Sequence, residues 1–182
     1  MEETNVVVLG NHGLVVAGQT VAEVDDRIES VCASFSAPAR SAPPADIEKL
    51  AAIAAGGDYR VPQDPAAHAV ALDPINLATA RQGSLYPDHV VFLGPGLVEA
   101  TVKNGRLNAP VESPRPPLML ALPGLGVLLH RSVSRGADAM ARCLADVAAR
   151  IPEDVSVRTL TAADERELLN WEAETYRQSL GR

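Results

Sequence analysis

The sequence predicts an α/β protein, and three observations carry this prediction. Apolar runs bounded by glycine occur at residues 6–9 and 14–16 and again at 118–122 and 127–130, as is typical of buried strands. Apolar residues at helical spacing follow each of these strand pairs. Asn104-Gly105 lies between two further apolar runs and predicts a tight hairpin.

The segment from Asn5 to Val24 predicts two buried strands, 6–9 and 14–16, joined by the reversal Gly10-Asn11-His12-Gly13. A helix is expected to start at Thr20, because Glu23 three residues later completes the capping-box pattern. The residues expected to form its buried stripe are Val21, Val24, Ile28, Val31, Cys32 and Phe35.

The next segment is rich in helix boundaries. Residues 38–44, rich in Pro, Ala and Ser, are expected to form a linker, and a helix should run from there to Gly56-Gly57. Asp64-Pro65 and Asp73-Pro74 each predict a cap followed by proline in the first helical turn, giving short helices over 65–72 and 74–81.

The remaining elements are expected as follows. We predict strands at 89–93, 98–102, 118–122, 127–130 and 155–160, and helices over 134–150 and from Thr161 onward. The last helix carries Leu168, Leu169, Trp171 and Tyr176.

Composition excludes several classes of protein. The 182 residues carry a net charge of −7 with 3% aromatic residues, which argues against nonspecific binding of nucleic acid. Mean hydropathy is +0.04, and neither a membrane span nor a secretory leader is recognisable. Cys32 and Cys143 show no zinc-ribbon or C-x-x-C spacing and are expected to be buried free thiols. We therefore expect a soluble, cytoplasmic protein.

Two histidines are candidates for chemistry. A neutral imidazole on a rigid turn is a good metal ligand, so His12 is the first candidate; the alternative is a hydrogen bond to a backbone carbonyl. Asp88 and His89 could form a catalytic dyad, although neighbours on a strand point to opposite faces and Asp88 after a proline is typical of a turn. His68 and His130 are expected to be structural or exposed.

The stretch from residue 5 to 24 resembles the third metal-ligand segment of the class II aldolase/adducin family. Two further stretches, 85–94 and 170–178, resemble the longer sugar-utilisation members of that family. The resemblance implies a three-layer α/β/α fold with a mixed, partly antiparallel sheet. It also implies a zinc-dependent carbon–carbon lyase of carbohydrate metabolism, acting on a sugar phosphate or related hydroxy-carbonyl compound.

The sequence departs from the family where the metal site is concerned. Family members hold the metal with an H-x-H pair plus the histidine of the N-H-G turn, and a glutamate acts as acid/base. No H-x-H occurs here, so the sequence resembles the back part of an aldolase. The resemblance implies that His12 is a metal ligand, and the candidate substrate-site residues are Asn11, Gly13, Asp88 and His89. The catalytic acid/base is not identifiable.

A weak internal repeat accompanies this resemblance. Residues 13–16 align with 126–129, and after a one-residue slip Val21 aligns with Val133 and Asp26 with Asp138; Leu125 stands where His12 stands in the first copy. We therefore divide the chain into an aldolase-like strand-turn-strand-helix (1–37), a helical linker region (38–84) and a degenerate second aldolase-like unit (85–182). Chance similarity is the alternative.

Two functions follow as hypotheses. The first is an aldolase-class polypeptide that self-associates or is completed by a separate N-terminal aldolase polypeptide. The second is a non-catalytic oligomerisation or binding module that keeps the fold without the metal site. Enzymes of this family are often tetramers with active sites at subunit contacts, so the resemblance implies self-association through the open sheet edge.

Overall fold

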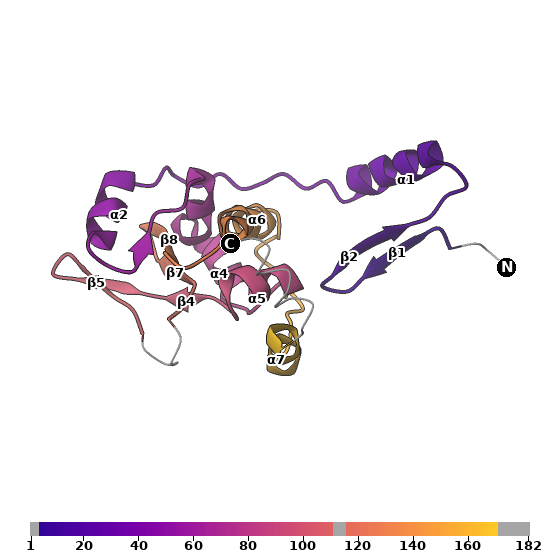
Figure 1. Ribbon diagram of the computed structural model, residues 1–182. Helices are drawn as coiled ribbons and strands as arrows, with labels where there is room; N and C mark the ends of the chain where they lie inside the picture. Colours follow the sequence, from indigo (N-terminus) through magenta and orange to yellow (C-terminus); the bar gives the residue numbers. More distant parts are fainter. Residues whose placement is uncertain (1–3, 111–115, 171–182) are drawn as a thin grey trace. The chain divides into compact units, whose positions relative to one another are not determined.

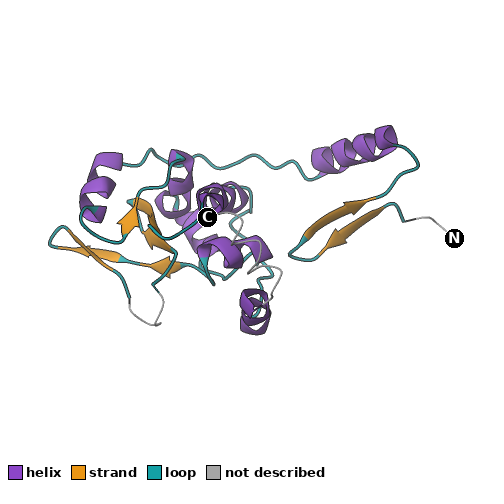
Figure 2. Ribbon diagram, in the orientation of Figure 1, coloured by secondary structure: helices purple, strands orange, loops and turns teal. Residues whose placement is uncertain are grey.

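The computed structural model describes residues 4–110 and 116–170 of the chain (Figures 1 and 2). The chain divides into two compact units, Met1–Pro38 and Ala39–Arg182. Helix and strand occur in both units, so the mixed α and β character predicted from the sequence is confirmed.

The first unit contains a hairpin and one helix. Strands β1 (Val6–Leu9) and β2 (Gly13–Val16) pair antiparallel, and helix α1 (Val21–Ser34) follows. The hydroxyl of Thr20 accepts a hydrogen bond from the backbone N–H of Glu23 at 3.2 Å, and the Glu23 carboxylate accepts one from the N–H of Gln19 at 2.9 Å. The predicted helix start is therefore confirmed.

The expectation that this unit has buried strands and a buried helical stripe is wrong. No residue of α1 is buried, and Cys32 is exposed. A two-stranded hairpin that is apolar on both faces needs a covering layer on each side, and the first unit does not supply both layers from its own residues. The large apolar side chains left exposed are Val7, Val8, Leu9, Leu14, Val15, Val21, Ile28 and Phe35.

The second unit is built on a four-stranded mixed sheet with the order β3-β8-β7-β4. Its strands are β3 (Tyr59–Arg60), β4 (Val98–Glu99), β7 (Met119–Leu122) and β8 (Gly126–His130). β8 pairs antiparallel with both β7 and β3, whereas β4 lies parallel to β7.

Alternate residues of β7 and β8 enter two separate cores. One core joins Leu120, Leu122 and Leu128 to helix α2 (Ile47–Ala54) through Leu50 and Ile53. The other core joins Met119, Ala121, Val127 and Leu129 to the elements η1 (Pro65–His68), α3 (Ala69–Leu72), α4 (Pro74–Ala80) and α6 (Arg135–Ala148).

Residues 39–84 belong to the same compact unit as the four-stranded sheet and contribute to both of its cores. Leu50 and Val70 are 1% and 0% exposed. Arg40 secures the start of this unit: its guanidinium donates to Asn76 Oδ1 at 2.9 Å and to carbonyl groups at the end of α6. Cations are favoured at a helix C-terminus, so this contact closes α6.

The turn and cap predictions are confirmed. Asn104 and Gly105 have φ values of 52° and 74° between β5 (Thr101–Lys103) and β6 (Arg106–Asn108), as a type I′ turn requires. The Asp64 carboxylate accepts from Ala66 N at 2.9 Å, and Asp73 caps α4 in the same way.

Two predicted strands are wrong. Residues 89–93 belong to helix α5 (Pro87–Leu93), in which Pro87 occupies the first turn, and residues 155–160 form no strand. The apolar run at residues 90–93 is too short to distinguish a strand from a helix by its period, and in the structure this segment packs against α6 as a helix. The final helix is α7 (Ala162–Asn170); Trp171 and Tyr176 lie outside the described residues.

Among the described helices, none combines the length and the apolar character that crossing a membrane would require.

Candidate functional site

His12 lies at the turn between β1 and β2. Asn11 takes a φ of 56°, and the N–H of His12 donates to the carbonyl of Leu9 at 3.1 Å, which closes the turn. The imidazole is exposed, and no described residue forms a hydrogen bond with its ring. Asn11 and Gly13 share the turn, so three of the candidate site residues lie together.

The residues of this turn do not make a metal site by themselves. No cluster of three or more His, Cys, Asp or Glu suited to a metal ion occurs in the described part of the chain. Zinc in a catalytic site ordinarily takes three protein ligands plus water or substrate. One exposed histidine therefore fits such a site only as a single ligand, and the described residues of this chain do not supply three ligands together.

Asp88 and His89 belong to the second unit, on α5. His89 is 1% exposed; its Nδ1 accepts from Leu85 N at 3.4 Å and its Nε2 donates to the carbonyl of Gly96 at 3.0 Å. Burial lowers the pKa of His89, while the Gly96 carbonyl and Glu165 oppose the shift. Both ring nitrogens are engaged inside the protein, so this imidazole is not presented to a ligand.

His89 is part of a polar network that ties α7 to the rest of the unit. The hydroxyl of Ser84 donates to Glu165 Oε1 at 2.6 Å and accepts from Gly96 N at 2.7 Å. The carbonyl of Ser84 accepts from Leu160 N at 2.9 Å. Sequence reasoning missed this network, because Ser84 and Glu165 belong to no recognisable motif and are far apart along the chain.

His68 is a second fully buried histidine. Its Nδ1 accepts from Val127 N at 3.1 Å, and its Nε2 has no hydrogen-bond partner among the described residues. Burial lowers the pKa of the imidazole. The neutral ring therefore anchors β8 to η1, in line with the structural role expected from the sequence. His130, at the end of β8, contacts Ser132 at 2.7 Å.

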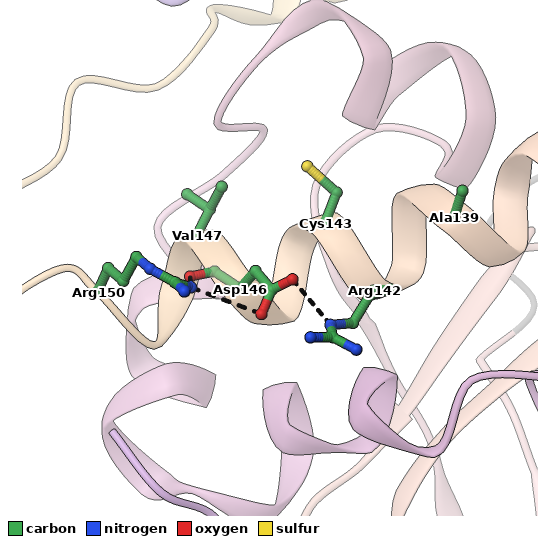
Figure 3. A pocket seen from close by; sticks show the side chains of 6 residues that line it. All are labelled: Ala139, Arg142, Cys143, Asp146, Val147 and Arg150. Carbon is green, nitrogen blue, oxygen red and sulfur yellow. Dashed lines mark hydrogen bonds and ion pairs between the residues drawn. The ribbon is translucent and has the colours of Figure 1, made fainter. Parts of the chain in front are cut away.

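A shallow hollow of about 360 Å³ runs along α6 (Figure 3). Its floor is apolar, and both arginines at its rim pair with Asp146, at 2.8 Å for Arg142 and 3.5 Å for Arg150. Arg142 also pairs with Asp64 at 3.0 Å, so both arginines of the rim are engaged in ion pairs within the chain. The lining residues are Ala139, Arg142, Cys143, Asp146, Val147 and Arg150.

A charge pair joins β3 to α6 in the second unit. Arg60 donates to both carboxylate oxygens of Asp138, at 3.0 and 2.6 Å, and Gln63 N donates to the same carboxylate at 2.9 Å. Burial opposes ionisation of Asp138, but these hydrogen bonds outweigh it and the pKa of Asp138 is lowered. The sequence offered no sign of this pair beyond the place of Asp138 in the weak repeat.

The turn at His12 has a counterpart in the second unit. Leu125 N donates to Leu122 O at 2.9 Å, as His12 N does to Leu9 O. Gly124 has a φ of 73° where Asn11 has 56°, and Gly126 has 139° where Gly13 has 153°. The two β-hairpins therefore share turn length and backbone geometry, and each is followed by a 14-residue helix.

Comparisons of the chain with protein-family models, with curated proteins and with solved structures found no match. The functional assignment therefore depends on the residues described above.

Proposed function

We propose that this chain is a class II aldolase-like polypeptide with an α/β/α fold of that family. His12 would supply one ligand of a divalent-metal site, zinc by family resemblance, and a partner polypeptide would supply the others. The reaction class is carbon–carbon cleavage of a sugar phosphate or related hydroxy-carbonyl compound. We expect the chain alone to be inactive. We also predict that it self-associates and that it is cytoplasmic.

The position of the His12 imidazole carries this proposal. The ring is exposed on a closed turn, so it can reach a group outside its own unit without rearrangement of the backbone. A histidine needed only for packing would be covered, as His68 is. The resemblance of residues 5–24 to a metal-ligand segment supports the same role.

The test combines the full chain with a polypeptide comprising the front half of a class II aldolase, which contains H-x-H. Zinc content after gel filtration and cleavage of a sugar phosphate are measured for each component and for the mixture. We expect zinc and activity in the mixture alone, both lost in His12→Ala. His130→Gln is the control, because His130 contacts Ser132 in the second unit and should leave both unchanged. A mixture without His12-dependent zinc would contradict the proposal.

A second candidate function is a non-catalytic binding or oligomerisation module. The exposed apolar side chains of β1, β2 and α1 favour it, because contiguous apolar surface in a folded protein marks contact with a partner. The two functions differ in one measurement: the module would bind its partner equally well with His12→Ala and without zinc.

A further inference from the structure

The uncovered first unit matches a covered part of the second unit. The order strand, three-residue turn, strand, helix is common to β1-β2-α1 and β7-β8-α6, and the turns have the same geometry. The surroundings of β7-β8-α6 therefore indicate what β1-β2-α1 lacks.

The helices agree position by position at the offset that aligns the two turns. The buried residues of α6 are Ala137, Asp138, Ala141, Leu144, Ala145 and Ala148. The corresponding residues of the first unit are Val24, Asp25, Ile28, Val31, Cys32 and Phe35. These residues are the apolar stripe of α1 and one aspartate beside it. A single offset therefore aligns both the turns and the helices, with Asp25 rather than Asp26 opposite Asp138.

In the second unit, α2 covers one face of the β-hairpin. Leu120, Leu122 and Leu128 are at most 1% exposed beneath it. The corresponding residues of the first unit are Val7, Leu9 and Val15, which are 42%, 41% and 50% exposed. The same apolar face is thus present in both units and is covered in one.

The glycine after the turn points to the same missing layer. A Cβ on Gly126 would lie 2.7 Å from His68 Nδ1 and 2.8 Å from Leu50 Cδ1, so this glycine makes room for the elements that cover the hairpin. Gly13 has a comparable φ and nothing within 4 Å of its Cβ position in the described structure.

The ion pair of the second unit indicates which charged side chain the missing element carries. Asp138 forms its bidentate pair with Arg60 of β3, the strand that lies antiparallel to β8. Asp25, at the matching place on α1, is exposed and has no partner among the described residues. In the described structure β2 pairs only with β1, so its other edge is open to a strand.

We propose that the first unit binds a partner polypeptide that places a strand antiparallel to β2 and an arginine against Asp25. The same partner covers Val7, Leu9 and Val15 with the apolar face of a helix. The partner would thus bind by adding a strand to the edge of β2, and the ion pair between its arginine and Asp25 would set the register of that strand. No metal, substrate or His12 contact enters this inference; it specifies the partner for the surface that favours the binding module, and it holds whether or not the chain takes part in catalysis.

The partner is a different polypeptide rather than a second copy of this chain. The segment with the required chemistry, residues 45–63, already packs against β8 and α6 in its own unit. If residues 45–63 bound the first unit of another copy, they would leave β8 and Asp138 of their own unit uncovered. Such an exchange would not reduce the number of uncovered hairpins.

The experiment uses a synthetic peptide of residues 45–63, labelled with a fluorophore, as the probe for the full chain. Binding is followed by fluorescence anisotropy in four combinations: wild-type or Asp25→Asn chain with the wild-type or Arg60→Gln peptide. Asp26→Asn is the matched control, because Asp26 is an adjacent carboxylate that lies outside the matched stripe. Light scattering of the chain without peptide reports self-association.

We expect saturable binding that weakens at least about tenfold with Asp25→Asn and stays unchanged with Asp26→Asn. The Arg60→Gln peptide should bind the wild-type chain with an affinity reduced by the same factor. Its affinity for the Asp25→Asn chain should be no lower than that of the wild-type peptide, because the two residues act as one pair. No binding, or equal losses with the two aspartate variants, would overturn the proposal. Self-association that Asp25→Asn abolishes would overturn it in favour of a second copy.

Discussion

Substituting Gly126 with alanine tests how the turn of the second unit is packed. Gly126 has a φ of 139°, a backbone conformation that costs an alanine about 1–3 kcal/mol. The new Cβ would also lie 2.7 Å from His68 Nδ1, so the ring must move away and Val127 N loses its hydrogen bond, which costs about 1–3 kcal/mol more. Together these contributions predict a loss of about 2–6 kcal/mol in the free energy of unfolding.

Gly124→Ala is the matched control within the same turn. Its φ is 73°, and nothing lies within 4 Å of its Cβ position, so only the backbone cost of about 1–2 kcal/mol applies. Urea unfolding followed by circular dichroism measures both variants, with an unchanged m value as the condition for comparison. If Gly126→Ala costs no more than Gly124→Ala, the close packing of His68 against this glycine is refuted.

Two further predictions concern charges in the second unit. Burial lowers the pKa of His68 and His89 below the ordinary value of 6.5, so the unfolded chain binds more protons and stability should fall as the pH drops below about 6.5. Urea unfolding at neutral and acidic pH measures this loss, and a His68→Gln variant with an unchanged pH dependence would contradict it. Asp138→Asn should cost about 1–3 kcal/mol, because it weakens the hydrogen bonds of the Arg60 guanidinium, which is 25% exposed, and removes its counter-charge. Asp146→Asn on the exposed side of the same helix should change stability by at most about 0.5 kcal/mol, and equal losses in the two variants would refute the distinction.

Much of the local structure was predictable, because it depends on residues close together in the sequence. Thr20, Asp64 and Asp73 cap helices through their own side chains and the next backbone N–H groups. Asn104-Gly105 adopts the predicted turn because these two residues tolerate positive φ. The turn that presents His12 was predictable for the same reason.

Other features depend on contacts across the chain and were not predictable. Residues 89–93 are helical because they pack against α6, although their composition also suits a strand. The pairing of Arg60 with Asp138 and the network of Ser84 with Glu165 join residues that no short motif connects. The sequence also predicted that the stripe of α1 is buried, since periodicity shows which face is apolar and not whether anything covers it.

Turns, helix caps and apolar faces follow directly from the sequence, because backbone preferences and side-chain periodicity are properties of a few neighbouring residues. The covered faces, the enclosed histidines and the paired charges are known only from the folded structure. Burial and ion pairing depend on the elements that surround a residue. His12 and Asp25 therefore differ from His68 and Asp138 in surroundings rather than in residue type.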